Sequence, residues 1–213
     1  MSTAIIDYGA GNLKSVVNAL HLLGEEPLIT KDPEVMRSAE RVILPGVGSF
    51  GDAMNRIRED GLEEVIREQA LCGKPFLGIC LGLQLLFEES EESPGVKGLS
   101  ILGGKIRRIP EIAVQGQDYP AGTSLKVPQI GWNSLSYPNH GRLFEGIPEN
   151  SHVYFVHSYY LRAEDPSIVT AKCSYSIDID ASVESGNLFA CQFHPEKSEK
   201  TGLKILKNFL EVR

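Results

Sequence analysis

Short apolar strands alternate with helical segments through the first 88 residues, and this alternation restricts the fold more than any other feature of the sequence. Strands are expected at Thr3–Asp7, Pro27–Thr30, Arg41–Leu44 and Lys74–Ile79, and the first and last of these read as buried. Helical apolar spacing is found at Leu13–Leu23, after Gly51 up to about Leu71, and from Leu81 to Glu88. Strands that alternate with helices form right-handed βαβ units, so we expect a parallel sheet covered by helices on both faces.

The second half is richer in strands than in helices. Strand-like segments are expected at Val127–Tyr137, His152–Leu161, Ile168–Ser174, Ile177–Val183 and Leu188–Phe193. Ser185-Gly186-Asn187 has the composition of a hairpin turn, and Gly202–Val212 that of an amphipathic helix. We therefore expect one α/β domain over residues 1–213, in which a mostly parallel central sheet is extended by antiparallel strands.

The charge balance excludes two classes of partner. A net charge of −7 argues against nucleic acid and against an anionic membrane, because neither attracts an acidic surface. Lys105, Arg107 and Arg108 form a local basic cluster, which we interpret as a solvated strand edge or loop. The acidic run Glu88–Pro94 is interpreted as a solvated loop, and Glu111–Lys126 as an irregular surface excursion.

The cysteines and the N-terminus indicate a reduced, cytoplasmic protein. Met1–Asp7 leads directly into an apolar strand without the features of a signal peptide, and no apolar run is long enough to span a membrane. Cys72, Cys80, Cys173 and Cys191 form no Cys-x-x-Cys pair, so neither a zinc site nor a disulfide scaffold is expected. Three of the four are expected to be plain buried side chains.

Cys80 is the candidate nucleophile. Lys74–Ile79 runs into Gly78-Ile79-Cys80-Leu81-Gly82, and a helix follows at once. This is the cysteine form of the nucleophile elbow, a strained strand-to-helix turn that raises the nucleophile above the sheet. Glycines stand on both sides because side chains there would collide with neighbouring backbone. A thiol at a helix N-terminus ionises more readily than a free thiol. The alternative is an inert buried cysteine in a turn.

His194 is the candidate base among five histidines, because it ends an expected strand and is followed by Pro195-Glu196. A carboxylate two residues beyond can return to the imidazole if the backbone stays extended, and Glu196 would then orient the ring as the third member of a triad. His21 and His140 are expected to be solvated, while His152 and His157 face opposite sides of one strand.

Pro45-Gly46-Val47-Gly48 follows the third strand and is the candidate oxyanion loop. Its glycines let the backbone amides of Gly46, Val47 and Gly48 turn toward a developing oxyanion, with the Leu81 amide as the other donor. A phosphate site is the rival interpretation, but the loop lacks the Gly-Lys-Ser/Thr ending of a P-loop. Gly9–Lys14 has lysine where a dinucleotide fingerprint needs its third small residue.

These motifs together resemble the class I, triad-type glutamine amidotransferases. Nearly the whole chain is similar to one branch of that family, the glutaminase subunits of imidazole glycerol phosphate synthases. The residues that carry this closer resemblance are Asp7–Asn12, Pro128–Asn133, Tyr154–Tyr159 and His194–Ser198. Leu83 stands where anthranilate- and aminodeoxychorismate-type glutaminases usually carry histidine.

The resemblance implies a flavodoxin-like glutaminase fold and hydrolysis of L-glutamine without a metal or organic cofactor. It implies that Gln84 and the backbone around Ser158 and Tyr159 hold glutamine. It also implies a heterodimer with a separate (β/α)8-barrel cyclase, which receives the ammonia and makes imidazole glycerol phosphate and an aminoimidazole carboxamide ribonucleotide in histidine biosynthesis. The residues implied for the docking face are Asn12, Trp132, Tyr154 and Lys197.

Three other functions stay open at this point. The chain could serve another synthase, such as an anthranilate synthase, as its glutaminase subunit. It could be a stand-alone thiol peptidase or γ-glutamyl hydrolase that is active without a partner. It could also be an interaction module that kept the fold without catalysis. Because the chain ends at Arg213, it has no room for a fused barrel, and a partner is expected to be a separate protein.

Overall fold

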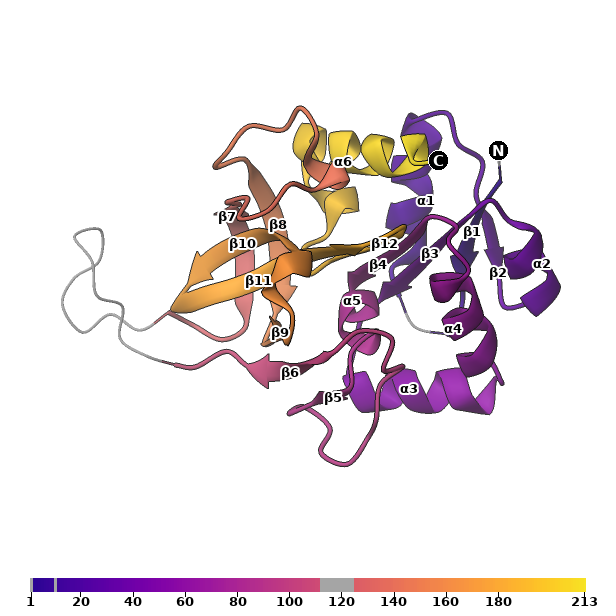
Figure 1. Ribbon diagram of the computed structural model, residues 1–213, viewed down its shortest axis with the longest axis horizontal. Helices are drawn as coiled ribbons and strands as arrows, with labels where there is room; N and C mark the ends of the chain where they lie inside the picture. The colour runs from indigo at the N-terminus through magenta and orange to yellow at the C-terminus, as the bar shows by residue number, and fades with distance from the viewer. Residues whose placement is uncertain (1, 10, 112–124) are drawn as a thin grey trace.

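A computed structural model describes residues 2–9, 11–111 and 125–213 of the protein (Figure 1). The surface excursion expected at Glu111–Lys126 therefore lies almost wholly outside the described residues. Within the described parts of the chain, no helix is both long and apolar enough to cross a membrane.

The core of the larger sheet is parallel, as the alternation predicts. Its parallel strands, in spatial order, are β2 (Leu28–Thr30), β1 (Thr3–Ile6), β3 (Arg41–Gly46), β4 (Phe76–Cys80) and β12 (Leu188–Cys191). The first four come from the first half of the chain. β12 comes from its end and lies directly beside β4, with Cys191 paired to Ile79.

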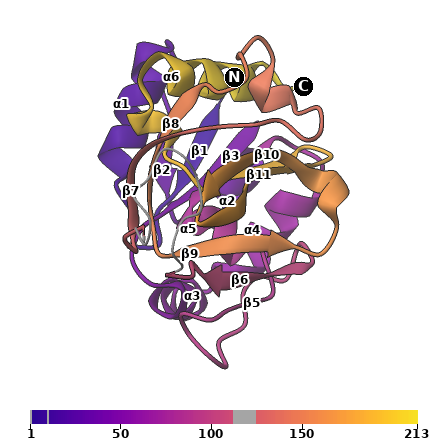
Figure 2. The ribbon, with the colours of Figure 1, turned by 90° about the vertical axis from the view of Figure 1, so that its left-hand side faces the viewer.

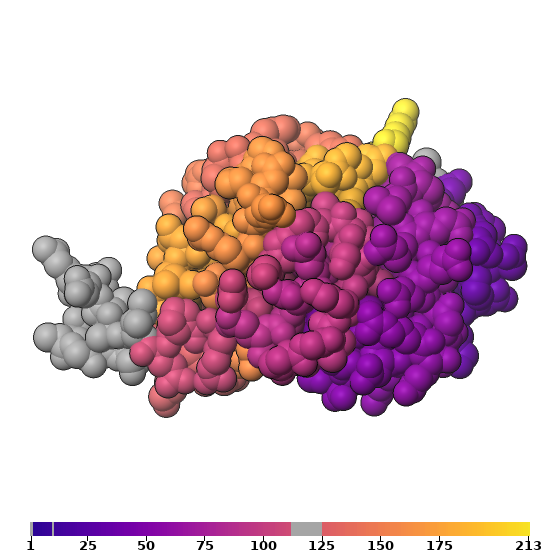
Figure 3. Space-filling view, turned by 60° about the horizontal axis from the view of Figure 1, so that its bottom comes forward, coloured from indigo at the N-terminus to yellow at the C-terminus, as the bar shows by residue number. Residues whose placement is uncertain are grey.

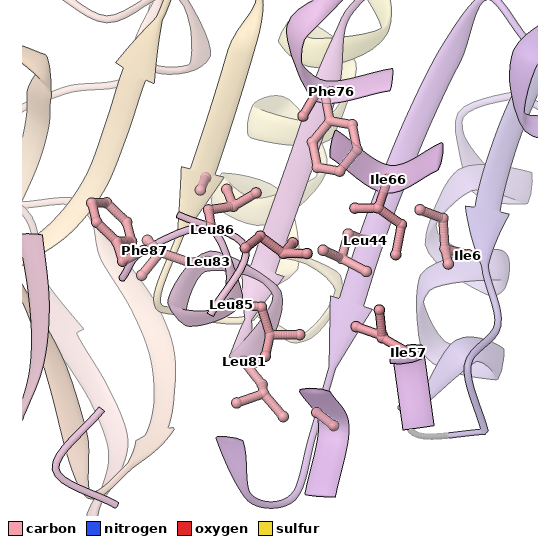
Figure 4. Close-up of a cluster of buried hydrophobic side chains, with 14 of the residues drawn as sticks. Ile6, Leu44, Ile57, Ile66, Phe76, Leu81, Leu83, Leu85, Leu86 and Phe87 are labelled. Carbon is pink, nitrogen blue, oxygen red and sulfur yellow. The ribbon is translucent and has the colours of Figure 1, made fainter. Parts of the chain in front are cut away.

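Helices cover both faces of this sheet (Figures 1 and 2). One face packs on α1 (Leu13–Leu22) and α6 (Glu199–Glu211), and the other on α2 (Pro33–Ser38), α3 (Phe50–Glu59), α4 (Glu63–Leu71) and α5 (Leu81–Leu85). Side chains that alternate along a strand enter opposite layers. Leu44 of β3 thus packs against Ile57 and Leu81 in one layer (Figure 4), while Ile43 lies in the other.

Further strands, most of them antiparallel, extend the sheet beyond β12. They are β11 (Ile177–Ser185), β10 (Val169–Tyr175), β9 (Tyr159–Ala163), β6 (Gly104–Arg108) and β5 (Glu89–Ser90), and only the last of these pairs is parallel, between β5 and β6. The hairpin expected at Ser185-Gly186-Asn187 joins β11 to β12. Figure 3 shows the early part of the chain (indigo and purple) at one end of a face and the orange segment around residues 160–185 toward the other, with the residues around 80–110 between them.

The strand expected at His152–Leu161 is two strands, so that prediction was wrong. β8 (His152–His157) pairs with β7 (Gln129–Ser134) in a separate small sheet, whereas β9 joins the large sheet. The break falls at Ser158, whose carbonyl accepts a hydrogen bond from the amide of Ile109 at 2.9 Å. The chain therefore changes sheets at one residue, which a continuous apolar pattern does not reveal.

Two helical details also differ from expectation. The helical stretch up to Leu71 is interrupted at Gly61, which has a φ of +68° and separates α3 from α4. The short helix α2 was not predicted; Asp32 caps it by accepting from the amide of Glu34, and Pro33 starts it. Three 3-10 turns complete the described elements: η1 (Arg142–Phe144), η2 (Pro166–Ile168) and η3 (Pro195–Lys197).

Surface charges and thiols largely follow expectation. The basic cluster lies on β6, next to the short edge strand β5, where Lys105 pairs with Glu89 and Arg107 with Glu91. Cys173 and Cys191 are buried, but Cys72 is exposed. Its expected burial was therefore wrong, because the residue caps the end of α4 at the surface rather than facing the sheet.

Candidate active site

Cys80 ends β4 in a strained backbone conformation. Its φ of 55° and ψ of −108° lie where side chains other than glycine are rarely found. The flanking glycines make this turn possible. A Cβ on Gly82 would lie 1.9 Å from the Leu44 carbonyl oxygen, and one on Gly78 would lie 2.8 Å from the Gly82 carbonyl oxygen. Any side chain at either position would force the strand and helix apart.

His194 reaches the same end of the sheet from β12. Because β12 runs parallel to β4 in the register Cys191↔Ile79, the residues after Cys191 emerge beside Cys80. Glu196 then returns to His194, with 2.7 Å between the Glu196 Oε1 and His194 Nδ1 atoms. An extended backbone was expected between the two residues, but the structure differs. Pro195 starts the 3-10 turn η3, and this turn brings the Glu196 carboxylate back to the ring.

The His194–Glu196 pair is shielded from water, with side-chain exposures of 2% and 1%. Burial lowers the pKa of His194, but the nearby Cys80 sulfur and the Glu196 carboxylate outweigh it and raise the pKa above its usual range. The imidazole is therefore held as a protonated ring next to a thiol. Such a ring can stabilise a thiolate and later give its proton to a leaving group.

A pocket of about 440 Å³ brings most of the candidate residues together. Its lining includes these predicted site residues: Val47, Gly48, Cys80, Leu81, Gln84, Ser158, Tyr159, His194 and Lys197. Gly46 lies behind the pocket, where it shares a second, much smaller cavity with Asn12, His194 and Glu196. Within the described ranges, no three potential metal-ligating side chains of histidine, cysteine, aspartate or glutamate come together.

Two buried glutamines connect the pocket wall to the nucleophile. Gln84 Nε2 donates to the Tyr159 carbonyl and to Gln192 Oε1, at 3.0 Å each. Gln192 Nε2 in turn donates to Cys80 Sγ at 3.7 Å. The sequence analysis missed Gln192, although its place two residues before His194 on the way out of β12 was a usable signal.

His157 forms a second buried contact with the same wall. Its Nδ1 lies 2.8 Å from the Tyr159 carbonyl and its Nε2 lies 2.9 Å from Gln129 Oε1. Burial, followed by the charge of His194, lowers the pKa of His157 to about 4, while its bond to Tyr159 partly opposes this. The ring is therefore neutral at pH 7. A neutral ring that donates from Nδ1 must accept at Nε2, so the Gln129 amide must turn its NH₂ group toward it.

Glu92 corrects the interpretation of the acidic run as a solvated loop. Its side chain lines the main pocket, and its Oε2 accepts from the Phe50 amide at 2.7 Å. The rest of the run behaves differently: Glu89 and Glu91 pair with bases on β6. Neighbouring acidic residues in a run carry no local signal that one of them turns inward.

An exposed patch flanks the pocket on the β7–β8 sheet. Trp132 and Ile130 are 46% and 63% exposed, so Trp132 is not a core side chain. Tyr154 packs edge-on against Trp132, and Lys197 Nζ lies 5.9 Å from the centre of the Tyr154 ring. We call Ile130, Trp132, Tyr154 and Lys197 the aromatic patch. Asn12 lies apart from it, at the small cavity, and its side chain does not cap α1.

Comparison with known proteins gives a consistent assignment along the chain. The profile of the family described as "Glutamine amidotransferase class-I" matches residues 4–212. The "Imidazole glycerol phosphate synthase subunit HisH" of Moorella thermoacetica is 48% identical over 209 residues, covering 98% of this chain and 94% of that protein. The protein of the same name from Methanothermobacter thermautotrophicus is 46% identical and covers 98% of both chains.

Solved structures agree in fold. A crystal structure of a glutamine amidotransferase superimposes with a TM-score of 0.73 at 21% identity, covering 98% of this chain and 97% of that one. A chain of the PurLQS structure from Thermotoga maritima gives 0.70 at 22% identity, with the same coverage of both chains. At these identities the likeness concerns the arrangement of helices and strands alone.

Proposed function

The chain belongs to the class-I glutamine amidotransferase family, a family of glutamine-hydrolysing enzymes, and from that premise we propose that Cys80, His194 and Glu196 form its catalytic triad. The observation that carries this proposal is the buried His194–Glu196 pair at the same strand ends as Cys80, with His194 and Cys80 lining the same pocket. Residues in the same arrangement support acyl transfer in unrelated folds.

The reaction follows from these positions. The Cys80 thiolate attacks the side-chain carboxamide carbon of glutamine and forms a tetrahedral adduct, whose oxyanion accepts from the amides of Leu81 and of the oxyanion loop. The protonated His194 ring gives its proton to the departing nitrogen, so the C–N bond breaks and ammonia leaves behind a thioester. The neutral ring then takes a proton from water, which attacks the thioester and releases glutamate.

Recognition of glutamine rests on the pocket wall. The Glu92 carboxylate, already anchored by the Phe50 amide, can accept from the α-ammonium group of the substrate. The backbone around Ser158 and Tyr159, fixed by hydrogen bonds from Ile109 and Gln84, lines the opposite part of the pocket. A substrate whose ammonium group lies at Glu92 and whose side-chain amide reaches Cys80 matches this pocket.

We propose that the protein is the glutaminase subunit of an imidazole glycerol phosphate synthase and delivers ammonia to a separate (β/α)8-barrel cyclase. Relatives 46–48% identical over nearly full length carry that enzyme's subunit name. The aromatic patch supports docking, because an exposed tryptophan beside a tyrosine is typical of interface centres. Lys197 belongs both to this patch and to the pocket lining, so the proposed docking surface adjoins the proposed catalytic pocket.

The test has a chemical arm and a partner arm. A glutamine-like chloroketone should abolish glutamine hydrolysis and label Cys80, but not the exposed Cys72; mass spectrometry that finds the label elsewhere would remove Cys80 from the mechanism. Cys80→Ser should lose several orders of magnitude in the rate of glutamine hydrolysis, and Cys72→Ser none.

Co-purification from native cells should recover a barrel cyclase, and loss of the gene should create a requirement for histidine. A requirement for tryptophan instead would assign the subunit to an anthranilate synthase.

A further inference from the structure

Tyr8 buries a hydroxyl that has no hydrogen-bond partner among the described residues. The residue follows β1 and is 1% exposed. Burial, and then the neighbouring charge of Cys80, raise the pKa of its phenol, while Arg56 opposes this. The hydroxyl therefore keeps its proton and remains a hydrogen-bond donor. Buried tyrosine hydroxyls usually find a partner, because an unpaired one keeps its full cost of desolvation.

This hydroxyl lies where the oxyanion loop meets the nucleophile elbow. A Cβ on Gly46 would lie 2.5 Å from Tyr8 Oη, 2.9 Å from Leu81 Cβ and 3.1 Å from the Gly82 amide nitrogen. The absence of a side chain at Gly46 is what leaves room for the hydroxyl. The Gly46 carbonyl carbon is bonded to the same Cα as that Cβ would be, so the Gly46 carbonyl is a backbone acceptor next to Tyr8 Oη.

The turn that carries Tyr8 is held on both sides. The Gly9 amide donates to Asp7 Oδ1 at 2.9 Å, and the Gly9 carbonyl accepts from Arg56 Nη1 on α3. The phenol ring itself packs in the core layer that contains Leu44 and Leu81. Tyr8 is thus a fixed group, whereas the adjoining loop has a 40% exposed Val47 and a glycine, Gly48, with a φ of +99° and open space around it.

Peptide geometry links the hydroxyl to the pocket. In a trans peptide the C=O and N–H bonds point in opposite directions. If the carbonyl of the Gly46–Val47 peptide turns inward to Tyr8, the Val47 N–H must turn outward, and Val47 lines the pocket beside Cys80. The Tyr8 hydroxyl makes no hydrogen bond to that carbonyl in this structure.

We propose that Tyr8 is a positioning residue for the oxyanion hole. Its hydroxyl donates to the Gly46 carbonyl when the Gly46–Val47 peptide turns inward, and this favours the orientation that offers the Val47 amide to the oxyanion. The hydrogen bond exists in one orientation only, so it shifts the balance between the two. The inference rests on the proposed function, because it needs an oxyanion to form at Cys80.

The test compares Tyr8→Phe with the unchanged protein, in complex with its cyclase subunit. We expect kcat for glutamine hydrolysis to fall about tenfold, the worth of one hydrogen bond, with an unchanged KM. The thermal midpoint should stay equal or rise, because the substitution removes an unpaired buried hydroxyl and keeps the ring. Tyr137→Phe is the matched control: it removes a hydroxyl that donates to the Pro148 carbonyl far from the pocket lining, and should leave kcat unchanged.

Alkylation of Cys80 by iodoacetamide separates the two ways in which the hydroxyl could act. This reaction occurs at a saturated carbon and forms no oxyanion, so its pH profile should be the same in Tyr8→Phe and in the unchanged protein. A shifted profile would mean that Tyr8 serves the thiolate, which overturns the inference, and so would an undiminished kcat. If the unchanged protein does not hydrolyse glutamine at all, the proposed function itself fails.

Discussion

The pKa values of two histidines that line the pocket are shifted in opposite directions. His194 has a carboxylate and a sulfur as neighbours, so its ring is held protonated, whereas His157 has a carbonyl and an amide and stays neutral. The charge on His194 adds to the lowering at His157. The wall thus has one proton carrier and one neutral hydrogen-bonding ring, which matches what a proton-transfer step needs.

Glu196→Gln should separate charge from shape in the His194–Glu196 pair. The amide oxygen can still accept from Nδ1, so the ring keeps its place, but the charge that favours the imidazolium is lost. Loss of the orienting acid in a comparable triad costs about 10⁴ in turnover, and we expect a fall of that order in kcat. Glu199→Gln, at the nearby start of α6, is the control. A fall of less than tenfold would mean that another group holds the ring.

Glu92→Gln should affect binding more than chemistry. The amide keeps an oxygen for the Phe50 amide but no longer attracts an ammonium group. Steady-state kinetics should therefore give a KM for glutamine raised about tenfold or more with a smaller change in kcat, because a charged hydrogen bond is worth about 1.5–3 kcal/mol. The exposed Glu149→Gln is the control. An unchanged KM would remove Glu92 from the substrate contacts.

At the scale of elements, the sequence predicts features that depend on repeated apolar patterns or on a short local motif. The strands β1, β3 and β4 stand out because they are largely apolar on both faces. Gly-x-Cys-x-Gly marks a turn in which a Cβ on either glycine would lie within 3 Å of neighbouring backbone. The sequence does not predict features that depend on contacts with residues distant in the chain. The break between β8 and β9 and the inward turn of Glu92 are both determined by residues far away in the chain.

Trp132→Ala should weaken docking of the cyclase subunit without changing the fold. The side chain is 46% exposed on β7 and contacts Tyr154, so its removal costs the free protein little. If it is a central contact of the interface, titration calorimetry should give an affinity lower by about 2 kcal/mol, roughly thirtyfold. Leu71→Ala, an exposed apolar residue on α4, is the control. Equal affinities for both variants would place the docking surface elsewhere.

At the scale of the whole molecule, His157 and His194 make the folding stability depend on pH in opposite ways. The unfolded chain protonates His157 near pH 6.5 but the folded chain only near 4, so the stability from the neutral ring is complete above pH 6.5 and is lost as the pH falls toward 4. His194 acts the other way: its contribution is complete below pH 6.5 and is lost as the pH rises through its raised pKa. The two effects occupy separate ranges.

His157→Gln should therefore flatten the acid side of the stability profile. Urea unfolding at several pH values should show that the unchanged protein loses up to about 3 kcal/mol more between pH 6.5 and 4 than the variant does, from roughly 1.4 kcal/mol per pKa unit. His140→Gln removes a histidine whose side chain is 81% exposed and should follow the unchanged protein. Parallel profiles for all three proteins would mean that the buried ring takes up its proton as freely as an exposed one.

The position of β12 has a consequence for synthesis on the ribosome. This strand is made long after β4, yet it lies between β4 and β11 within the larger sheet and leads to Gln192, His194 and Glu196. A nascent chain that already contains Cys80 still lacks both the base and the strand beside it. Domains fold as units during translation, so under the proposed mechanism a chain that stops before β12 would carry Cys80 without its proton carrier and would release no ammonia.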